Sequence, residues 1–415
     1  MHGHGHSHHH GSHSDEVPAR TKRLLTLVTV PLIVLTILGF LLLRPAEVRD
    51  LSSAVELPTD LYNGIVTSID AVPCPGVDEE TPSCRVAEVR LTEGPDEGQT
   101  VTFEVGDPNA VRAVAEGGRI VVARTEIEPD TYAYDFADVQ RAGPMAVLGL
   151  IFAVSVVALG RMRGLAALVA IGVSLGILVQ FVLPAILSGR NPLAVAVVGS
   201  AGVMFIALYM SHGVNVRTTS AVLGTLASLA ITALLALLFV ELTQLTGFAS
   251  EEATYIRVAS ASINLQGILL GGIIIGSLGV LDDVTVTQAS AVWELHLANP
   301  GLGRRKLYGS AIRIGRDHIA STVNTLVLAY AGAALPLLIL FTIAEARLGD
   351  VLTGEIVAEE VVRTLVGSIG LVASVPITTA LAVLVVSSGG SSPAPPPPPA
   401  EPEPNADRRV FWEND

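Results

Sequence analysis

The chain has 415 residues, of which half are hydrophobic and 15% are charged, and its formal net charge is −14. Soluble proteins usually have about a quarter of their residues charged, so this composition indicates a membrane protein. Residues 47–142 hold 20 acidic and 7 basic side chains. That acidity argues against nucleic acid as a partner, because binding phosphates needs clustered Lys and Arg.

The chain starts with a histidine-rich tail, residues 1–23. Its imidazoles are His2, His4, His6, His8, His9, His10 and His13. Histidines at this density bind divalent metal ions loosely, which favours a metal-handling tail. The alternatives are an expression tag and an inert low-complexity tail.

Eight stretches are long and apolar enough to cross a bilayer as helices. They are residues 24–43, 144–160, 165–187, 193–210, 218–240, 263–281, 319–344 and 365–386. The first has no small-residue cleavage site after it, so we interpret it as an uncleaved anchor rather than a signal peptide. The sequence therefore predicts an α-helical polytopic membrane protein with about eight transmembrane helices.

The loop charges predict how the spans are oriented, because Lys and Arg are retained on the cytoplasmic side. Basic residues precede the first span, and the largest basic group follows the sixth: Arg304, Arg305, Lys306, Arg313 and Arg316. Acidic residues gather in the alternate loops. We therefore expect a plasma-membrane protein with both termini in the cytosol and residues 47–142 outside the cell.

The predicted outer domain, residues 47–142, contains short β-rich runs at 64–69, 85–91, 100–105 and 119–124, separated by turn residues. This pattern predicts a small antiparallel barrel or sandwich, and its spacing is compatible with an OB-like barrel. Cys74 and Cys84 are the only cysteines, and we predict a disulfide between them, which requires an oxidising space. Two unpaired thiols are the alternative.

The sixth span is rich in glycine and ends in a polar stretch. Gly267 with Gly271 and Gly272 with Gly276 have the spacing that lets two helices approach closely. Oxygen-bearing side chains follow: Asp282, Asp283, Thr285, Thr287 and Gln288. Such ligands suit Mg, Mn or Ca, so a divalent-metal or proton-exchange site is one interpretation. The other is that the two carboxylates cap a following helix.

Residues 284–318 are predicted to form amphipathic helices on the cytosolic side. More polar side chains, Asp317, His318, Asn324 and Thr325, lie where the seventh span begins. Ser211 and His212 lie between the fourth and fifth spans. We predict that these residues converge with the Asp282 segment at the cytosolic end; a satisfied polar seam between helices is the alternative. The tail, residues 388–415, is proline-rich and predicted to be a disordered linker.

Several segments occur in the same order as in a known family. They are residues 134–141 with Pro144, residues 210–213 with Arg217, Thr218 and Thr219, and residues 279–288 and 324–336. Together they resemble the YibE/F family of bacterial membrane proteins over about residues 47–386. The resemblance implies a multi-pass membrane fold and no defined activity, and both tails lie outside it.

The leading functional hypothesis is a transporter or permease, linked to a cation, in which the polar residues form the path. The first alternative is a membrane sensor or assembly factor that acts through the outer domain and the tails. The second is an intramembrane aspartyl protease, for which Asp283 and Asp317 are the available pair. Because both lie at the membrane edge, we do not expect an enzyme. Expected partners are the lipid bilayer, a second copy and other membrane proteins.

Overall fold

A computed structural model describes residues 18–45, 60–72, 84–105, 114–260, 263–344 and 347–389. It has two compact units. The first contains Met1–Arg44, Asn191–Thr246 and Gln266–Asp415, and the second contains Pro45–Arg190 and Gly247–Leu265.

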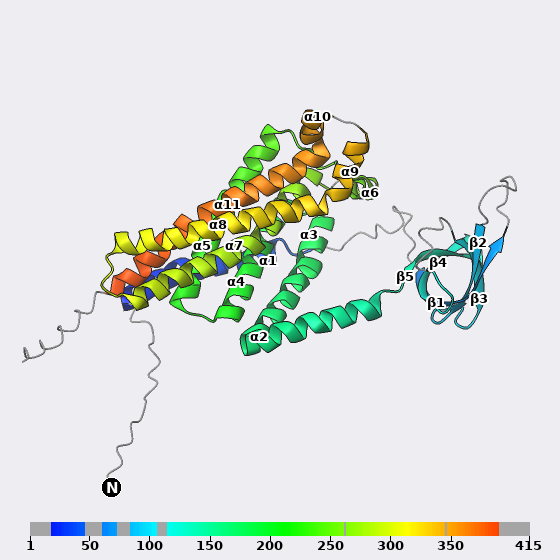
Figure 1. Ribbon diagram of the computed structural model, residues 1–415, viewed down its shortest axis with the longest axis horizontal. Coiled ribbons are helices and arrows are strands. Elements are labelled where there is room, and N and C mark those ends of the chain that lie inside the picture. Colours follow the sequence, from blue (N-terminus) through cyan, green and yellow to red (C-terminus); the bar gives the residue numbers. More distant parts are fainter. Residues whose placement is uncertain are drawn as a thin grey trace, which may run out of the picture. The chain divides into compact units, whose positions relative to one another are not determined.

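The second unit includes a small, nearly closed antiparallel sheet (Figure 1). Its strands are β1 (Asp60–Val72), β2 (Cys84–Leu91), β3 (Thr100–Val105), β4 (Arg119–Glu128) and β5 (Thr131–Val139). The order is β3-β2-β1-β4-β5, and the outer strands β3 and β5 come close to one another. Near-closure of this kind leaves little exposed strand edge.

Apolar side chains at alternate positions of the strands form the core of this sheet. Val66, Val89, Ile120 and Val122 point inward and are almost fully buried. The four predicted strands are confirmed. The fifth, β5, was not predicted, although its aromatic residues recur at every second position.

A polar cluster ties the turn before β3 to strands β4 and β5. The Tyr134 hydroxyl donates to Asp96, and Arg124 Nε lies 3.2 Å from Asp96 Oδ2. The Arg124 guanidinium also stacks over the Tyr132 ring at 3.3 Å. Burial raises the pKa of the Tyr134 phenol, and its hydrogen bond to Asp96 raises it further.

We expect the Tyr134 phenol to ionise above its ordinary pKa when the intact chain is titrated by tyrosinate absorbance. Because the folded-state pKa is raised, this phenol stabilises the fold fully below its ordinary pKa of about 10, and the stabilisation is lost as pH rises through the folded value. Tyr134→Phe should remove the late step, whereas Tyr132→Phe should leave it. Identical curves for wild type and Tyr134→Phe would contradict the assignment.

The second unit also contains an apolar helical stretch of 46 residues, built from α2 (Ala142–Ile177), the π-helix η3 (Leu178–Val182) and α3 (Leu183–Leu187). Arg161 has a non-helical backbone, with φ 50° and ψ −130°. The two arms meet there so tightly that a Cβ on Gly164 would overlap the Val156 carbonyl oxygen. The predicted interruption between residues 160 and 165 is therefore present as a sharp turn (Figure 1). A short helix, α6 (Glu251–Ala259), belongs to the same unit and was not predicted.

The first unit is helical. Its helices are α1 (Ala19–Leu42), α4 (Pro192–His212), α5 (Val216–Leu242), α7 (Leu265–Ala298), α8 (Arg304–Ala333), α9 (Leu335–Ile343), α10 (Leu348–Thr353) and α11 (Glu355–Val386), followed by the 3-10 turn η4 (Ser387–Gly389). Across both units, six helices are long and apolar enough to cross a membrane, or seven if the pair α8–α9, bent by 59°, is one span. Within the described residues the chain is thus a multi-helix membrane protein.

Three predicted boundaries differ from the structure. Helix α11 begins at Glu355, ten residues before the predicted eighth span. Helix α7 continues through Asp282 and Asp283 to Ala298, and α8 runs unbroken from Arg304 past residue 318. The apolar periodicity continues past the acids, because Val292 and Trp293 are buried against α8 and α11. The interpretation that Asp282 and Asp283 cap a new helix is therefore wrong.

Helices α5 and α11 are in extensive contact and lie side by side in Figure 1. A Cβ on Gly224 of α5 would overlap the Thr378 hydroxyl of α11, and a Cβ on Gly370 of α11 would overlap the Thr232 hydroxyl of α5. From the first contact to the second, the residue number rises along α5 and falls along α11, so the two helices are antiparallel. Glycine at each crossing is what allows this approach in a membrane-type bundle.

Candidate functional site

Asp282 is an ionisable residue inside a helix long enough to span a membrane. Its side chain is partly buried, and its Oδ1 atom is fully buried with no hydrogen-bond partner among the described residues. An ionised carboxylate in such a place is costly unless a proton, a cation or a donor neutralises it. Ionisable residues within spans are for this reason candidates for function.

One turn further along α7, a pair of hydroxyls links this helix to α5. The Oγ1 atoms of Thr225 and Thr285 are 2.6 Å apart, and both residues are fully buried. Thr285 Oγ1 also lies 3.1 Å from the Asp282 carbonyl, and Thr225 Oγ1 lies 3.0 Å from the Ala221 carbonyl. Each hydroxyl has a single proton, so one threonine donates to the other, and the second donates to its own helix.

Gln288 joins three helices. Its Nε2 atom donates to the Ala311 carbonyl of α8 at 3.0 Å and to Thr379 Oγ1 of α11 at 2.7 Å. A Cβ on Gly315 of α8 would lie 2.8 Å from Gln288 Oε1, so the glycine makes room for the amide. Both amide protons are thus used to join α7 to α8 and α11, and the amide oxygen lies toward Gly315.

The remaining residues of the proposed divalent-metal site are not brought together. Asp283 and Thr287 are exposed, because successive residues of a helix are turned by about 100° and face different directions. No group of three or more His, Cys, Asp or Glu side chains that could hold a metal occurs in the described parts of the chain. Of the predicted set, Asp282 is partly buried and Thr285 and Gln288 are buried, and Thr285 faces α5.

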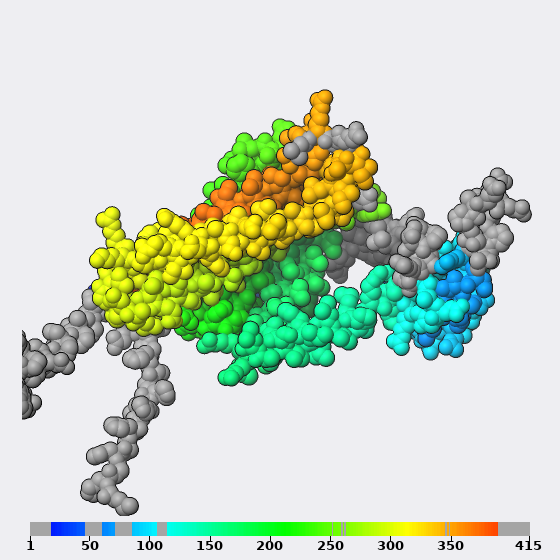
Figure 2. Space-filling model, viewed as in Figure 1, coloured from blue at the N-terminus to red at the C-terminus, as the bar shows by residue number. Residues whose placement is uncertain are grey.

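The α8 residues are also split between faces. Asp317, Asn324 and Thr325 are exposed, on a helix that covers much of the visible surface of the first unit (Figure 2, yellow). His318 is partly buried, its Nε2 lacks a partner among the described residues, and its carbonyl accepts from Thr322. No hydrogen bond joins Asp283 to Asp317, and both are exposed, so the geometry does not support an aspartyl protease.

Ser211 and His212 end α4. Ser211 is partly buried, and the His212 carbonyl accepts from the Asn215 amide at 2.9 Å, which orders the turn into α5. The seven histidines of the tail, Cys74 and residues 390–415 lie outside the described residues, so the metal tail and the disulfide stay predictions. Cys84 begins β2.

The buried hydroxyls of α5 and α11 were missed by the sequence reasoning. Ser228, Thr232, Ser374 and Thr378 are all fully buried. The sequence contains a signal that could have found these hydroxyls, because residues 216–238 and residues 362–384 have similar sequences. Serine and threonine at four-residue spacing within an apolar span mark a helix-packing face.

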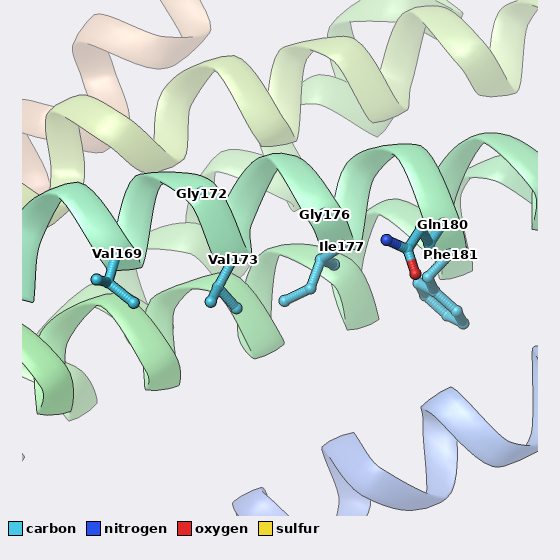
Figure 3. Close-up of a pocket in the computed structure, with 7 residues that line it drawn as sticks. All are labelled: Val169, Gly172, Val173, Gly176, Ile177, Gln180 and Phe181. Atoms are coloured by element: carbon cyan, nitrogen blue, oxygen red, sulfur yellow. The ribbon is translucent and has the colours of Figure 1, made fainter. Parts of the chain in front are cut away.

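A groove runs along α2 and η3 in the second unit (Figure 3). It is lined by Val169, Gly172, Val173, Gly176, Ile177, Gln180 and Phe181. The two glycines open it, and a Cβ on either would meet nothing within 4 Å. None of the predicted site residues lines it, and its walls are largely apolar, so it does not extend the candidate site.

The fold and the site define a multi-pass membrane protein with polar groups buried between its helices. A family model for YibE/F-like proteins matches residues 148–388. The chain belongs to this family, as the sequence motifs predicted. No curated protein and no solved structure matched the chain.

We expect Gln288→Leu to lower the free energy of unfolding by about 2 kcal/mol, because Thr379 and Ala311 lose a buried donor. The neighbouring Thr287→Val is the matched control, since Thr287 is exposed and should tolerate the change. Thermal unfolding of the detergent-solubilised chain measures both. Equal losses in the two variants would show that Gln288 does not join the helices.

Proposed function

We propose that the protein is a cation-linked transporter whose working cycle includes neutralisation of Asp282 by a proton or a cation. The observation that carries the proposal is the buried, unpartnered Oδ1 of a carboxylate within a continuous membrane-length helix. Close by, the Thr225–Thr285 contact connects this helix to α5. A change of charge at Asp282 therefore acts on a helix that is fixed to its neighbours on both sides.

A monovalent species suits this position better than a divalent metal. Asp282 supplies one negative charge, while Asp283 is exposed and the nearby side chains of Thr285 and Gln288 are neutral. Sites for Mg or Ca commonly use several carboxylates to offset the charge of the ion. The proposal therefore replaces the divalent-metal interpretation of this segment with proton or monovalent-cation exchange.

Asp282→Asn should abolish proton movement when the purified chain is placed in liposomes and a salt gradient is imposed, with an internal pH dye as the readout. The amide keeps the shape of the side chain and removes its charge. Asp283→Asn is the matched control and should keep the wild-type rate. The proposal fails if Asp282→Asn moves protons as fast as wild type, or if both variants lose the flux equally.

We further propose eight spans in a plasma membrane, with both termini in the cytosol and the β-domain, an OB-like barrel, outside. Counting α8–α9 as one span and dividing the α2–α3 stretch at the Arg161 turn supports eight. The near-closure of β3 on β5 supports the barrel.

This topology predicts that a phosphatase reporter, active only outside the cytosol, is active when fused after Gln140 and inactive when fused after Gly389. A cytosolic fluorescent reporter fused at the same two positions should give the inverse pattern. Activity at both positions, or the reverse pattern, would contradict the orientation.

A sensor or assembly factor is the second candidate. It is favoured by the direct contact of α5 with α11 and by a β-domain that has its own buried core. Liposomes that contain the wild-type chain and show no proton or cation flux under any imposed gradient would favour this candidate over transport.

A further inference from the structure

A polar cavity lies at one end of the first unit, where α7 and α11 end and α8 begins. Its volume is about 160 Å³, and His296 of α7, Arg304 of α8 and Ser387 are among the residues that line it. About 10–15 Å³ of such space holds one water molecule, so the cavity has room for a group of several heavy atoms. No residue of the candidate functional site lines it.

Two polar atoms at this cavity are buried without a partner. They are His296 Nδ1 and Ser387 Oγ, and neither has a hydrogen-bond partner among the described residues. Folded proteins satisfy nearly all of their buried polar atoms, so two unsatisfied atoms at one cavity indicate that a ligand binds there. Both groups can donate, the hydroxyl with its own proton and the imidazole when Nδ1 carries the proton.

Arg304 adds a charged donor at the start of α8. Its Nη2 atom donates to the Ser387 carbonyl at 3.3 Å, which holds the guanidinium at the cavity. A guanidinium has five N–H donors, so this one bond leaves capacity for a ligand. Gly303, which precedes α8, has no side chain to cap the helix, and the first amides of a helix attract anions. Such a set of donors suits a phosphate group, which accepts several hydrogen bonds.

The charge at this end of the unit is strongly positive. Glu294 of α7 is 3.8 Å from Arg217 of α5, which brings the start of α5 to the same end. Glu294 is the only carboxylate in the described residues of this end, which are 18–30, 213–220, 290–313 and 376–389. The basic residues in the same ranges are Arg20, Lys22, Arg23, Arg217, Arg304, Arg305, Lys306 and Arg313. Eight cations therefore face one anion.

The cavity lies at the level where the apolar part of α1 begins. Leu25 belongs to one apolar cluster with Leu307 of α8 and Val386 of α11. One turn earlier, the Thr21 hydroxyl donates to Ser388 Oγ at 2.7 Å, so the ends of these helices meet here (Figure 1, lower left end of the helices). Basic residues at the end of a span lie at the level of the lipid headgroups, and the apolar residues beyond them lie in the hydrocarbon.

A shallow groove along α1 shows the same change from basic to apolar. It is lined by Lys22, Arg23, Thr26, Leu27, Val30 and Pro31. A phospholipid has this order of chemistry, because its anionic headgroup is followed by acyl chains. A soluble phosphate compound has no apolar part to cover the groove. The phosphate of a lipid is therefore the better match for this end of the unit.

We propose that the cavity between α7, α8 and α11 binds the phosphate of an anionic phospholipid, with His296, Arg304 and Ser387 as donors. The surplus of positive charge favours an anionic lipid over a zwitterionic one. The site goes beyond the proposed function and does not rest on it, since Asp282 lies fourteen residues before His296 on α7.

The test is the thermal midpoint of the purified, full-length chain in detergent, with increasing phosphatidylglycerol, phosphatidylcholine or inorganic phosphate. A ligand of the folded chain raises the midpoint, and phosphatidylglycerol should raise it most. Arg304→Gln should weaken the affinity for phosphatidylglycerol about tenfold, because a charged donor is lost. Ser387→Ala should also weaken it and should fold at least as well as wild type, because the hydroxyl it removes has no partner.

Arg313→Gln is the matched control. It removes the same charge from the same helix, but Arg313 donates to the Ser310 hydroxyl at 3.0 Å and does not line the cavity. It should keep the wild-type affinity. Each variant is compared with its own lipid-free midpoint, so a change in basal stability does not enter the result.

Four results would overturn the proposal. Phosphatidylcholine that raises the midpoint as much as phosphatidylglycerol would show that the phosphate site does not select an anionic lipid. Inorganic phosphate with the same effect as the lipid would make the ligand a soluble one. An equal loss of affinity in Arg313→Gln and Arg304→Gln would point to diffuse attraction rather than a site. Wild-type affinity in either Arg304→Gln or Ser387→Ala would remove the cavity from lipid binding.

Discussion

The contact between α5 and α11 is the constraint on which the rest of the first unit depends. In lipid, helices gain little from burying apolar side chains, so close packing and hydrogen bonds must hold them. Gly224 and Gly370 let the two backbones approach, and Thr378 and Thr232 fill the space above them. Further along, Val240 of α5 and Val362 of α11 belong to one apolar cluster, so the same antiparallel register extends beyond the polar centre.

Helix α7 is fixed to this pair at two levels. Thr285 joins it to α5, and Gln288 joins it to α11 and to α8. Asp282 lies just before these two anchors on the same helix. These hydrogen bonds connect the segment that contains Asp282 to α5, α8 and α11. The proposed change of charge at Asp282 would therefore occur on a helix that is fixed to three others.

Hydropathy and turn residues predicted much of the fold. They gave the approximate positions of the apolar helices, four of the five strands and the interruption near Arg161. They failed at residues 281 and 318, because acidic and basic residues were interpreted as span ends, whereas buried residues such as Trp293 and Leu307 show that packing continues beyond them. A charged residue makes it costly for a helix to remain in the membrane, but tertiary packing determines whether the helix ends at that residue.

The candidate site was predicted in part. Asp282, Thr285 and Gln288 are buried or partly buried, but Asp283 and Thr287, chosen from the same run, face outward. Adjacent residues of a helix point in different directions, so they cannot all face one site. A run of oxygen-bearing residues in the sequence therefore suggests more ligands than the helix can bring together. The hydroxyls of α5 and α11 were missed because each looks ordinary within its own span, and their importance emerges when the two spans are aligned.

The central claim is the antiparallel register of α5 against α11, and disulfide cross-linking tests it most directly. The paired variant Ser228→Cys with Ser374→Cys, with a protease site inserted in the turn between α7 and α8, should stay joined after oxidation and cleavage. Ser228→Cys with Val372→Cys is the control, because Val372 lies on the exposed side of α11. The account predicts a cross-link in the first pair and none in the second. A cross-link in the second pair alone, or in neither, would contradict it.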